Sequence, residues 1–310
     1  MEGWVDHNVE GVMVGLKGLR PEIRKQSQIV LGPWNHYSRL SVDDIEYPGD
    51  KFGPGQVQLS LAWFDRMLKG KGADKAPVSE YYTIGTGEWH TMEAWPPITE
   101  QIALYLSNEG KLMPTPTGIG NASYEYDPAN PVKTVGGNQL MSWMGGNFVP
   151  NGVHIQPDYS DRSDVLVFRS EPFAEAMTIA GSGEVLLEVS TTAPDTAFMV
   201  RLCEEFEDGR VMNLLLDGAS SILLRNESDT ILDYTPGEKV VLNFHLWDTA
   251  WQMKKGSRLR LVITSSNFPM YHLHPNRAGI WSTYEDWDKA KQTVYFGTEN
   301  SVVHLPVLKS

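Results

Sequence analysis

Most of this chain is patterned for β-strands that have one apolar face. In residues 240–247 every second side chain is a large apolar one, and residues 258–264 repeat the alternation. A period of two is typical of a strand with one buried face. Asp208-Gly209 stands between two further runs of this kind and is the sequence signal of a two-residue hairpin turn. Strands joined by polar turns predict a β-sandwich or jelly roll.

The beginning of the chain has a different periodicity. Apolar residues at spacings of three, four and seven predict helices over residues 8–19 and 56–69, and Gly70 stands where a left-handed residue would end the second helix. Residues 27–31 form a short apolar run that leads into Gly32-Pro33, which is typical of a buried strand followed by a loop. Alternating helix and strand signals predict part of a doubly wound α/β sheet.

The stretch from residue 70 to 77 is polar and rich in glycine and lysine, and we place a domain boundary there. The predicted fold class is mixed. Residues 1–75 are expected to be a C-terminal fragment of an α/β-hydrolase domain that carries a catalytic acid and histidine. Residues 76–310 are expected to be an all-β jelly-roll sandwich.

Charge and composition exclude several function classes. The chain has 26 basic and 39 acidic residues, a net charge of −13. An acidic surface repels phosphate backbones and anionic lipid headgroups, so we expect neither nucleic-acid nor membrane partners. No apolar run of membrane-spanning length and no basic-then-apolar N-terminal segment occurs. We therefore expect a soluble chain, with a cytoplasmic location favoured over secretion.

The single cysteine, Cys203, has no second cysteine with which to form an internal disulfide. It lies in an alternating apolar run, which favours a buried structural thiol over a reactive one.

Two short motifs near the start could carry chemistry. One, Gly-Trp-Val-Asp, ends at Asp6; the other, Gly-Pro-Trp-Asn-His, ends at His36, thirty residues later. An acid and then a histidine, each after an apolar strand, are the last two members of an α/β-hydrolase triad in chain order. The carboxylate would orient the imidazole, which would accept the proton of a serine hydroxyl. The structural alternatives are a helix cap for Asp6 and a loop histidine for His36.

The nucleophile is the missing member. No Gly-x-Ser-x-Gly segment occurs in the chain, and the triad order would put the serine before Met1. Only five residues precede Asp6, about what one buried central strand needs by itself. We therefore expect residues 1–75 to be a fragment of a larger domain, and the chain alone to be inactive.

These motifs belong to a longer series that resembles the CocE/NonD serine hydrolases, whose relatives include the X-Pro dipeptidyl-peptidases and the α-amino-acid ester hydrolases. After the acid and histidine motifs, further similar segments follow in order at residues 63–70, 87–89, 94–97, 127–131, 163–168 and 265–269. Each segment alone is a weak signal. The ordered series covers nearly the whole chain and is specific.

The resemblance implies an α/β-hydrolase part followed by a jelly roll that walls the substrate cleft. It implies acyl transfer to a serine and then hydrolysis of an ester or amide, with stabilisation of the oxyanion intermediate. Carried over by position, Asp6 matches the triad acid and His36 the general base. No cofactor is implied. The expected partners are a small ester or amide substrate, and either the missing N-terminal hydrolase segment or another copy of the chain.

Three aromatic residues beside the motifs are candidates for substrate binding. Trp4 and Trp34 could line an acyl pocket, with core packing as the alternative. Tyr37 follows the triad histidine where the family commonly has a glycine, which would narrow the rim of the cleft. The amino-ester branch has acidic residues two and three positions after the triad acid, but here Asn8 and Val9 occupy them. No carboxylate that would bind a substrate ammonium group is predicted at these two positions.

Two other readings stay open. His272 and His274 could present two imidazoles on one strand face, but a proline-flanked loop explains the segment equally, and we expect no metal site. The main alternative function is a non-catalytic jelly-roll module for binding or interaction, because a fold does not determine a function.

Overall fold

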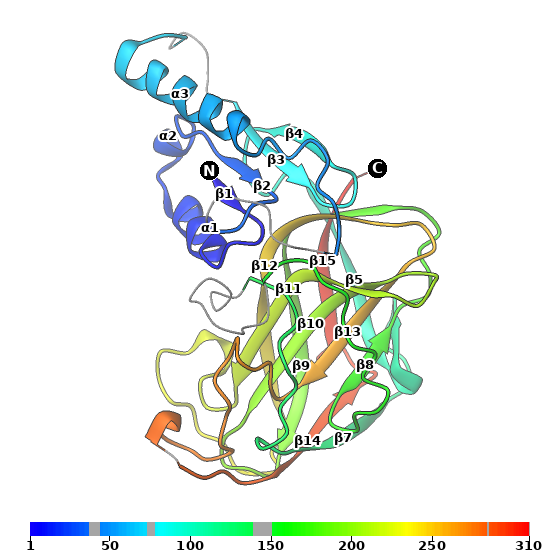
Figure 1. The fold of residues 1–310 in the computed structure, drawn as a ribbon. Coiled ribbons are helices and arrows are strands. Elements are labelled where there is room, and N and C mark those ends of the chain that lie inside the picture. Colours follow the sequence, from blue (N-terminus) through cyan, green and yellow to red (C-terminus); the bar gives the residue numbers. More distant parts are fainter. Residues whose placement is uncertain (37–43, 73–77, 139–150, 284, 310) are drawn as a thin grey trace.

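The computed structural model describes residues 1–36, 44–72, 78–138, 151–283 and 285–309. A small layer of helices and short strands at the N-terminal end packs against a larger body of β-sheet (Figure 1). The chain is thus mostly β-structure with few helices, as the alternating pattern predicts.

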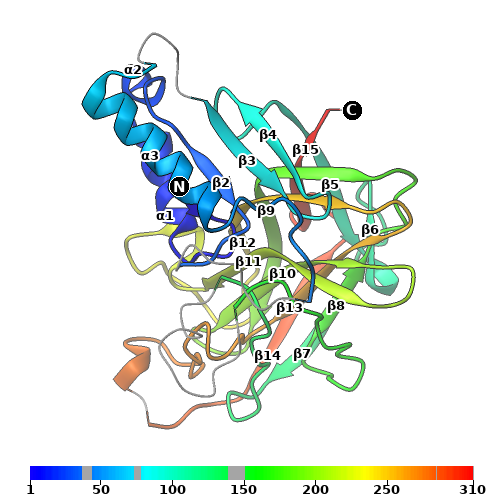
Figure 2. The ribbon, with the colours of Figure 1, turned by 45° about the horizontal axis from the view of Figure 1, so that its top comes forward.

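The N-terminal layer is built on a four-stranded sheet. Its strands have the order β1-β2-β3-β4, in which β1, β2 and β3 run parallel and β4 is antiparallel to β3. The elements of the layer are β1 (Glu2–Gly3), α1 (Val9–Gly18), α2 (Pro21–Arg24), β2 (Val30–Gly32), α3 (Pro54–Lys69), β3 (Ser79–Thr83) and β4 (Glu88–Met92). Figure 2 shows the third helix, α3, on the side of this layer away from the β-body, whereas the first helix, α1, contacts the β-body.

The two helices predicted from periodicity are confirmed as α1 and α3. Gly70 ends α3 with φ 69°, the left-handed conformation that glycine adopts without steric cost. The four-stranded sheet spans the predicted domain boundary, because β3, which follows residue 75, pairs with Val30 and Leu31 of β2, which precedes it. The division at residue 75 therefore stays a prediction.

Among the described residues, eleven strands form the second sheet, with a path β11-β10-β13-β8-β6-β5-β15-β9-β14-β7 and with β12 paired to β9. The hairpin predicted at Asp208-Gly209 is confirmed, since β10 and β11 pair antiparallel around it. The predicted two-residue turn is wrong: the Phe206 amide donates to the Arg210 carbonyl at 2.8 Å, so the loop has the three residues 207–209. The strands are β5 (Thr99–Ser107), β6 (Lys111–Met113), β7 (Gly120–Tyr126), β8 (Leu166–Arg169), β9 (Met177–Thr191), β10 (Ala197–Glu205), β11 (Val211–Ser221), β12 (Val240–Met253), β13 (Arg258–Thr264), β14 (Ala290–Phe296) and β15 (Val302–Leu308). Short 3₁₀ turns lie at Asn108–Gly110, Arg225–Glu227 and Trp281–Thr283.

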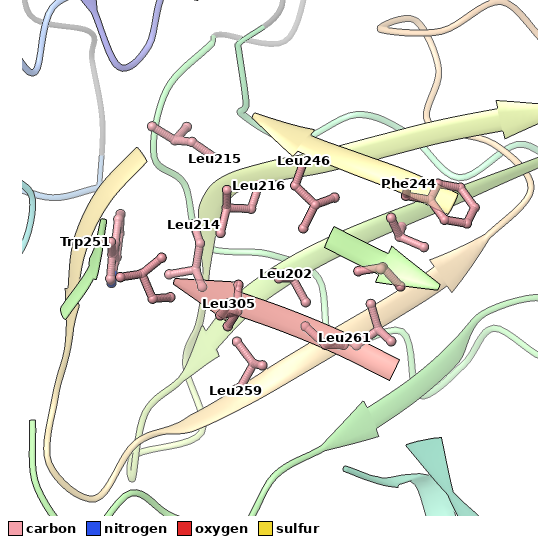
Figure 3. Packing of buried hydrophobic residues seen from close by; sticks show 14 of the residues in the cluster. Leu202, Leu214, Leu215, Leu216, Phe244, Leu246, Trp251, Leu259, Leu261 and Leu305 are labelled. Atoms are coloured by element: carbon pink, nitrogen blue, oxygen red, sulfur yellow. The ribbon is translucent and has the colours of Figure 1, made fainter. Parts of the chain in front are cut away.

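The core of the β-body is apolar and closed to solvent. In β12, Leu242, Phe244 and Leu246 are at most 1% exposed, whereas His245 between them is exposed, so the predicted alternation is confirmed. Figure 3 shows apolar side chains from β10, β11, β12, β13 and β15 meeting in one interior. Burial of this apolar area, at about 25 cal/mol per Å², is the main stabilising contribution.

One buried ion pair lies on the opposite face of β10 from this hydrophobic interior, because Arg201 alternates with Val200 and Leu202, which belong to the core. The Arg201 guanidinium donates to Asp217 at 2.6 Å, to Gln156 at 2.6 Å and to Asn267 at 3.2 Å. Both charged side chains are less than a tenth exposed. A charge removed from water is tolerated only when its hydrogen bonds are satisfied in this way.

The two layers share a continuous core. Ile84 forms a β-bridge with Trp251 of β12, and the Trp95 indole donates to Asp248 of the same strand at 2.7 Å. The N-terminal layer is therefore held firmly on the end of the β-body. Within the described part of the chain, no helix is long and apolar enough to cross a membrane.

Candidate active site

The parallel pairing of β1 with β2 brings the two predicted catalytic residues together. Asp6 follows β1 and His36 follows β2, and the C-terminal ends of adjacent parallel strands lie at one edge of a sheet. Beyond the strands the two loops stay joined. The Trp4 amide donates to the Gly32 carbonyl at 2.9 Å, and the Val5 amide donates to the Trp34 carbonyl at 3.2 Å.

Gly3 allows this close approach of the two loops. A Cβ atom at position 3 would lie 1.8 Å from the carbonyl oxygen of Trp34, which is backbone and cannot move aside without shifting its loop. Only glycine avoids that clash. The glycine of the first motif therefore sets the position of the second motif.

Asp6 and His36 face each other at the edge of the sheet. Both carboxylate oxygens of Asp6 lie 3.3 Å from Nδ1 of His36. The Asp6 side chain is 8% exposed and that of His36 is 36% exposed, so a buried acid stands behind a histidine that reaches the surface. Oδ1 of Asp6 also accepts the amide of Asn8 at 2.9 Å.

Asp6 also makes hydrogen bonds in the turn that leads into α1: its carboxylate accepts the Asn8 amide at 2.9 Å, and its carbonyl accepts the Val9 amide at 3.2 Å. The residue before α1 is Asn8, whose side chain makes no capping hydrogen bond. Asp6 lies two residues further back, and its carboxylate also faces the imidazole of His36. The cap-like turn and the pairing with His36 are therefore both present.

A second histidine, which the sequence analysis did not select, belongs to the same cluster. Nδ1 of His7 lies 3.3 Å from Oδ1 of Asp6, and its ring is 4.5 Å from the His36 ring between centroids. Burial lowers the pKa of His7, against the opposing effect of the Asp6 carboxylate. Its place directly after Asp6 is the only signal in the sequence that could have pointed to it.

Glu2 adds a second carboxyl group behind Asp6. Burial raises the pKa of the Glu2 carboxyl to about 7. The Gly3 amide, which donates a hydrogen bond to Glu2, opposes this rise. The charge of Asp6 and a hydrogen bond between Asp6 and Glu2 increase the rise. Two carboxyl groups that share a hydrogen bond hold a proton more tightly than one alone.

Both tryptophans proposed for substrate binding are buried. The Trp4 indole donates to the Tyr82 carbonyl at 2.7 Å, and the Trp34 indole donates to the Asp50 carbonyl at 3.0 Å. Each side chain is at most 1% exposed. Core packing therefore describes both in this structure, and neither reaches a surface open to a substrate. Tyr37 lies outside the described residues.

The two histidines of the loop at 272–274 make local hydrogen bonds. His274 is fully buried and uses both ring nitrogens: Nε2 faces Asp195 at 3.2 Å, and Nδ1 accepts the Asn276 amide at 3.0 Å. Nδ1 of His272 lies 2.8 Å from the Leu273 carbonyl at the surface. The two imidazoles do not converge.

Comparison with known proteins places the chain in a family. Residues 71–304 match the model of the X-Pro dipeptidyl-peptidase C-terminal non-catalytic domain, so Asp6 and His36 lie outside the matched part. The chain is 31% identical to cocaine esterase of Rhodococcus sp. strain MB1 Bresler, over 91% of this chain and 52% of the esterase. The chain spans about half the length of the curated relatives it matches.

Solved structures share the fold. An aminopeptidase from a marine-sediment Thaumarchaeota archaeon superposes with a TM-score of 0.87 at 24% identity, covering 99% of this chain and 54% of that one. An α-amino acid ester hydrolase superposes with a TM-score of 0.79 at 24% identity, over 98% and 54% of the two chains. The chain belongs to the X-Pro dipeptidyl-peptidase C-terminal domain family and is a relative of the CocE/NonD hydrolases.

Proposed function

We propose that this chain supplies the acid and the general base of a Ser-His-Asp hydrolase that cleaves a small ester or amide. Asp6 is the acid, His36 is the base, and the serine comes from polypeptide outside this sequence. In this proposal residues 1–75 complete an α/β-hydrolase domain, and residues 76–310 form the jelly roll beside it.

The observation that carries the proposal is the Asp6–His36 pair at the shared edge of β1 and β2. In a Ser-His-Asp triad a carboxylate faces Nδ1 of the histidine and Nε2 accepts the serine proton, and Asp6 stands at Nδ1 of His36. The carboxylate also stabilises the imidazolium that forms during acyl transfer. The exposed side of His36 is where a nucleophile would have to approach.

The exposed apolar side chains of α3 support the proposal that further polypeptide packs on this helix. Together with β2 and the segment at 23–28, α3 borders a groove of about 500 Å³. Its lining is mixed: Trp63, Phe64 and Met67 of α3 are apolar, and glutamine and serine side chains lie among them. In doubly wound folds helices cover both faces of the sheet. We propose that the N-terminal hydrolase segment covers this groove; a second copy of the chain is the alternative occupant.

The test is a chimera in which the part of cocaine esterase that this chain does not span is joined before residue 1. We expect the chimera to hydrolyse p-nitrophenyl acetate. Asp6→Asn or His36→Ala should each lower kcat by a factor of about 10³–10⁴. His90→Ala, a histidine on β4, is the matched control and should leave kcat unchanged.

Circular dichroism and labelling by a fluorophosphonate show whether the chimera has folded with a reactive serine. A folded, labelled chimera whose activity does not change in the Asp6 and His36 variants would contradict the proposal.

A further inference from the structure

The cluster beside β1 and β2 contains three metal-ligating side chains. One ligand atom each from Asp6, His7 and His36 lies within 4.8 Å of the other two. Asp6 and His7 are adjacent on the loop before α1, and His36 comes from the loop after β2. Two short loops held together by backbone hydrogen bonds thus present a carboxylate and two imidazoles to one point.

The distances in the cluster are long for hydrogen bonds between charged groups. A carboxylate and an imidazolium normally approach to about 2.7–2.9 Å. Here Nδ1 of His36 is 3.3 Å from both oxygens of Asp6, and Nδ1 of His7 is also 3.3 Å from Oδ1. Zinc bonds of about 2.0–2.1 Å at tetrahedral angles put neighbouring ligand atoms about 3.3 Å apart. Two of the ligand-to-ligand distances in the cluster, from Asp6 to each imidazole, therefore equal the edge of a zinc tetrahedron, and the third lies within 4.8 Å.

We propose that Asp6, His7 and His36 bind a divalent transition-metal ion of the zinc type. Imidazole nitrogen and carboxylate oxygen are ligands that suit zinc, whereas magnesium and calcium prefer oxygen alone. Three protein ligands leave a coordination position for an outside molecule, the arrangement of open rather than structural zinc sites.

Metal binding has a consequence that rests on the proposed function. The ion would take Nδ1 of His36, the same nitrogen that Asp6 must hold to orient the general base. The metal-bound and the catalytic arrangements therefore exclude each other, and zinc becomes a reversible inhibitor of the assembled hydrolase.

The first experiment is isothermal titration of the full chain with ZnCl₂ after treatment with a chelator. We expect one zinc ion per chain and at least tenfold weaker binding in His7→Phe, which keeps the aromatic contact with His36. His272→Phe is the matched control at an exposed histidine and should bind as the unmodified chain does. Equal affinity in His7→Phe, equal loss in His272→Phe, or no zinc binding at all would overturn the proposal.

A second measurement reports the geometry directly. Cobalt(II) added to the unmodified chain should give the intense visible bands of a four-coordinate ion, and Asp6→Asn should abolish them. A weak spectrum of six-coordinate cobalt would overturn the site. Neither experiment measures hydrolysis, so failure of the metal site leaves the triad proposal standing, and failure of the triad leaves the metal site standing.

Discussion

Strand β12 and helix α3 carry equally regular apolar faces, yet only one of those faces is buried. On β12, Leu242, Phe244 and Leu246 are at most 1% exposed. On α3, Leu61 is 61% exposed and Leu68 is 76% exposed. Figure 1 shows the reason: β12 lies inside the β-body, whereas α3 lies on the far side of the N-terminal layer, away from the β-body.

The difference teaches that periodicity specifies which side chains share a face but not what covers that face. The strands of the β-body fold against one another, so their apolar faces find partners within the chain. The face of α3 has the correct helical spacing but lies open to solvent. An apolar surface of this kind is a feature of binding interfaces.

Thiol labelling gives the largest expected contrast between the two regions. Cys203 in β10 is fully buried, and burial raises the pKa of its thiol to about 12 from an ordinary value of 9. Below pH 9 the native thiol therefore keeps its proton, and the thiolate that reacts forms only on opening. A cysteine introduced on α3 by Leu61→Cys, in a Cys203→Ala background, should react with Ellman's reagent more than about a thousandfold faster at pH 8.

Labelling in urea supplies the control for Cys203. The two cysteines should react at similar rates once the chain is unfolded. Rapid labelling of Cys203 in the native chain at pH 8 would contradict a closed core at β10.

Truncation of one phenylalanine in each region compares the energetics. Phe244→Ala removes a side chain that is 1% exposed, and the cavity and lost burial should lower the free energy of unfolding by about 3–5 kcal/mol. Phe64→Ala removes one that is 51% exposed on α3, and the change should be about 0.5 kcal/mol or less. Urea unfolding followed by tryptophan fluorescence measures both. Equal losses would show that α3 is covered in solution.

The two regions also differ in their ion pairs. Asp217→Asn keeps the shape of the side chain but leaves the Arg201 charge buried without its counter-ion, at a cost of about 3 kcal/mol. Asp65→Asn on α3 breaks a solvent-exposed pair with Lys69 and should leave the urea midpoint unchanged, because solvent screens such pairs. Unfolding curves at low and high salt test this expectation, because salt should not restore the stability of the Asp217 variant.

Local patterns predicted a large part of the fold and the site. Alternation predicted the buried face of β12, and the glycine at position 70 predicted the end of α3. In β13 the alternation is a poorer guide, because Arg260 and Thr264 on the polar face are buried as well. The acid and the histidine come together because two strand-loop motifs in succession form neighbouring parallel strands. That step needed only the rule that parallel strands end at one edge.

Pairings across the chain were less predictable. Strand β3 has apolar and aromatic residues that would fit either sheet, and its pairing with β2 depends on which edge is available. The burial of Trp4 depends on Tyr82 and Trp95, partners 78 or more positions away in the sequence. His7 carries no pattern of its own, and only the distance to His36 shows its place in the cluster.

The smallest effect on stability is expected from charge on the open face of α3. Leu61→Glu combined with Leu68→Glu replaces two side chains that already contact water, so the free energy of unfolding should change by about 0.5 kcal/mol or less. The same change should lower self-association of the isolated chain in sedimentation velocity, because the apolar face is what two copies could share. It should also weaken the activity of the chimera if the hydrolase segment packs on α3. A double variant that unfolds at much lower urea would show instead that this face is buried within the chain, and the contrast with β12 would disappear.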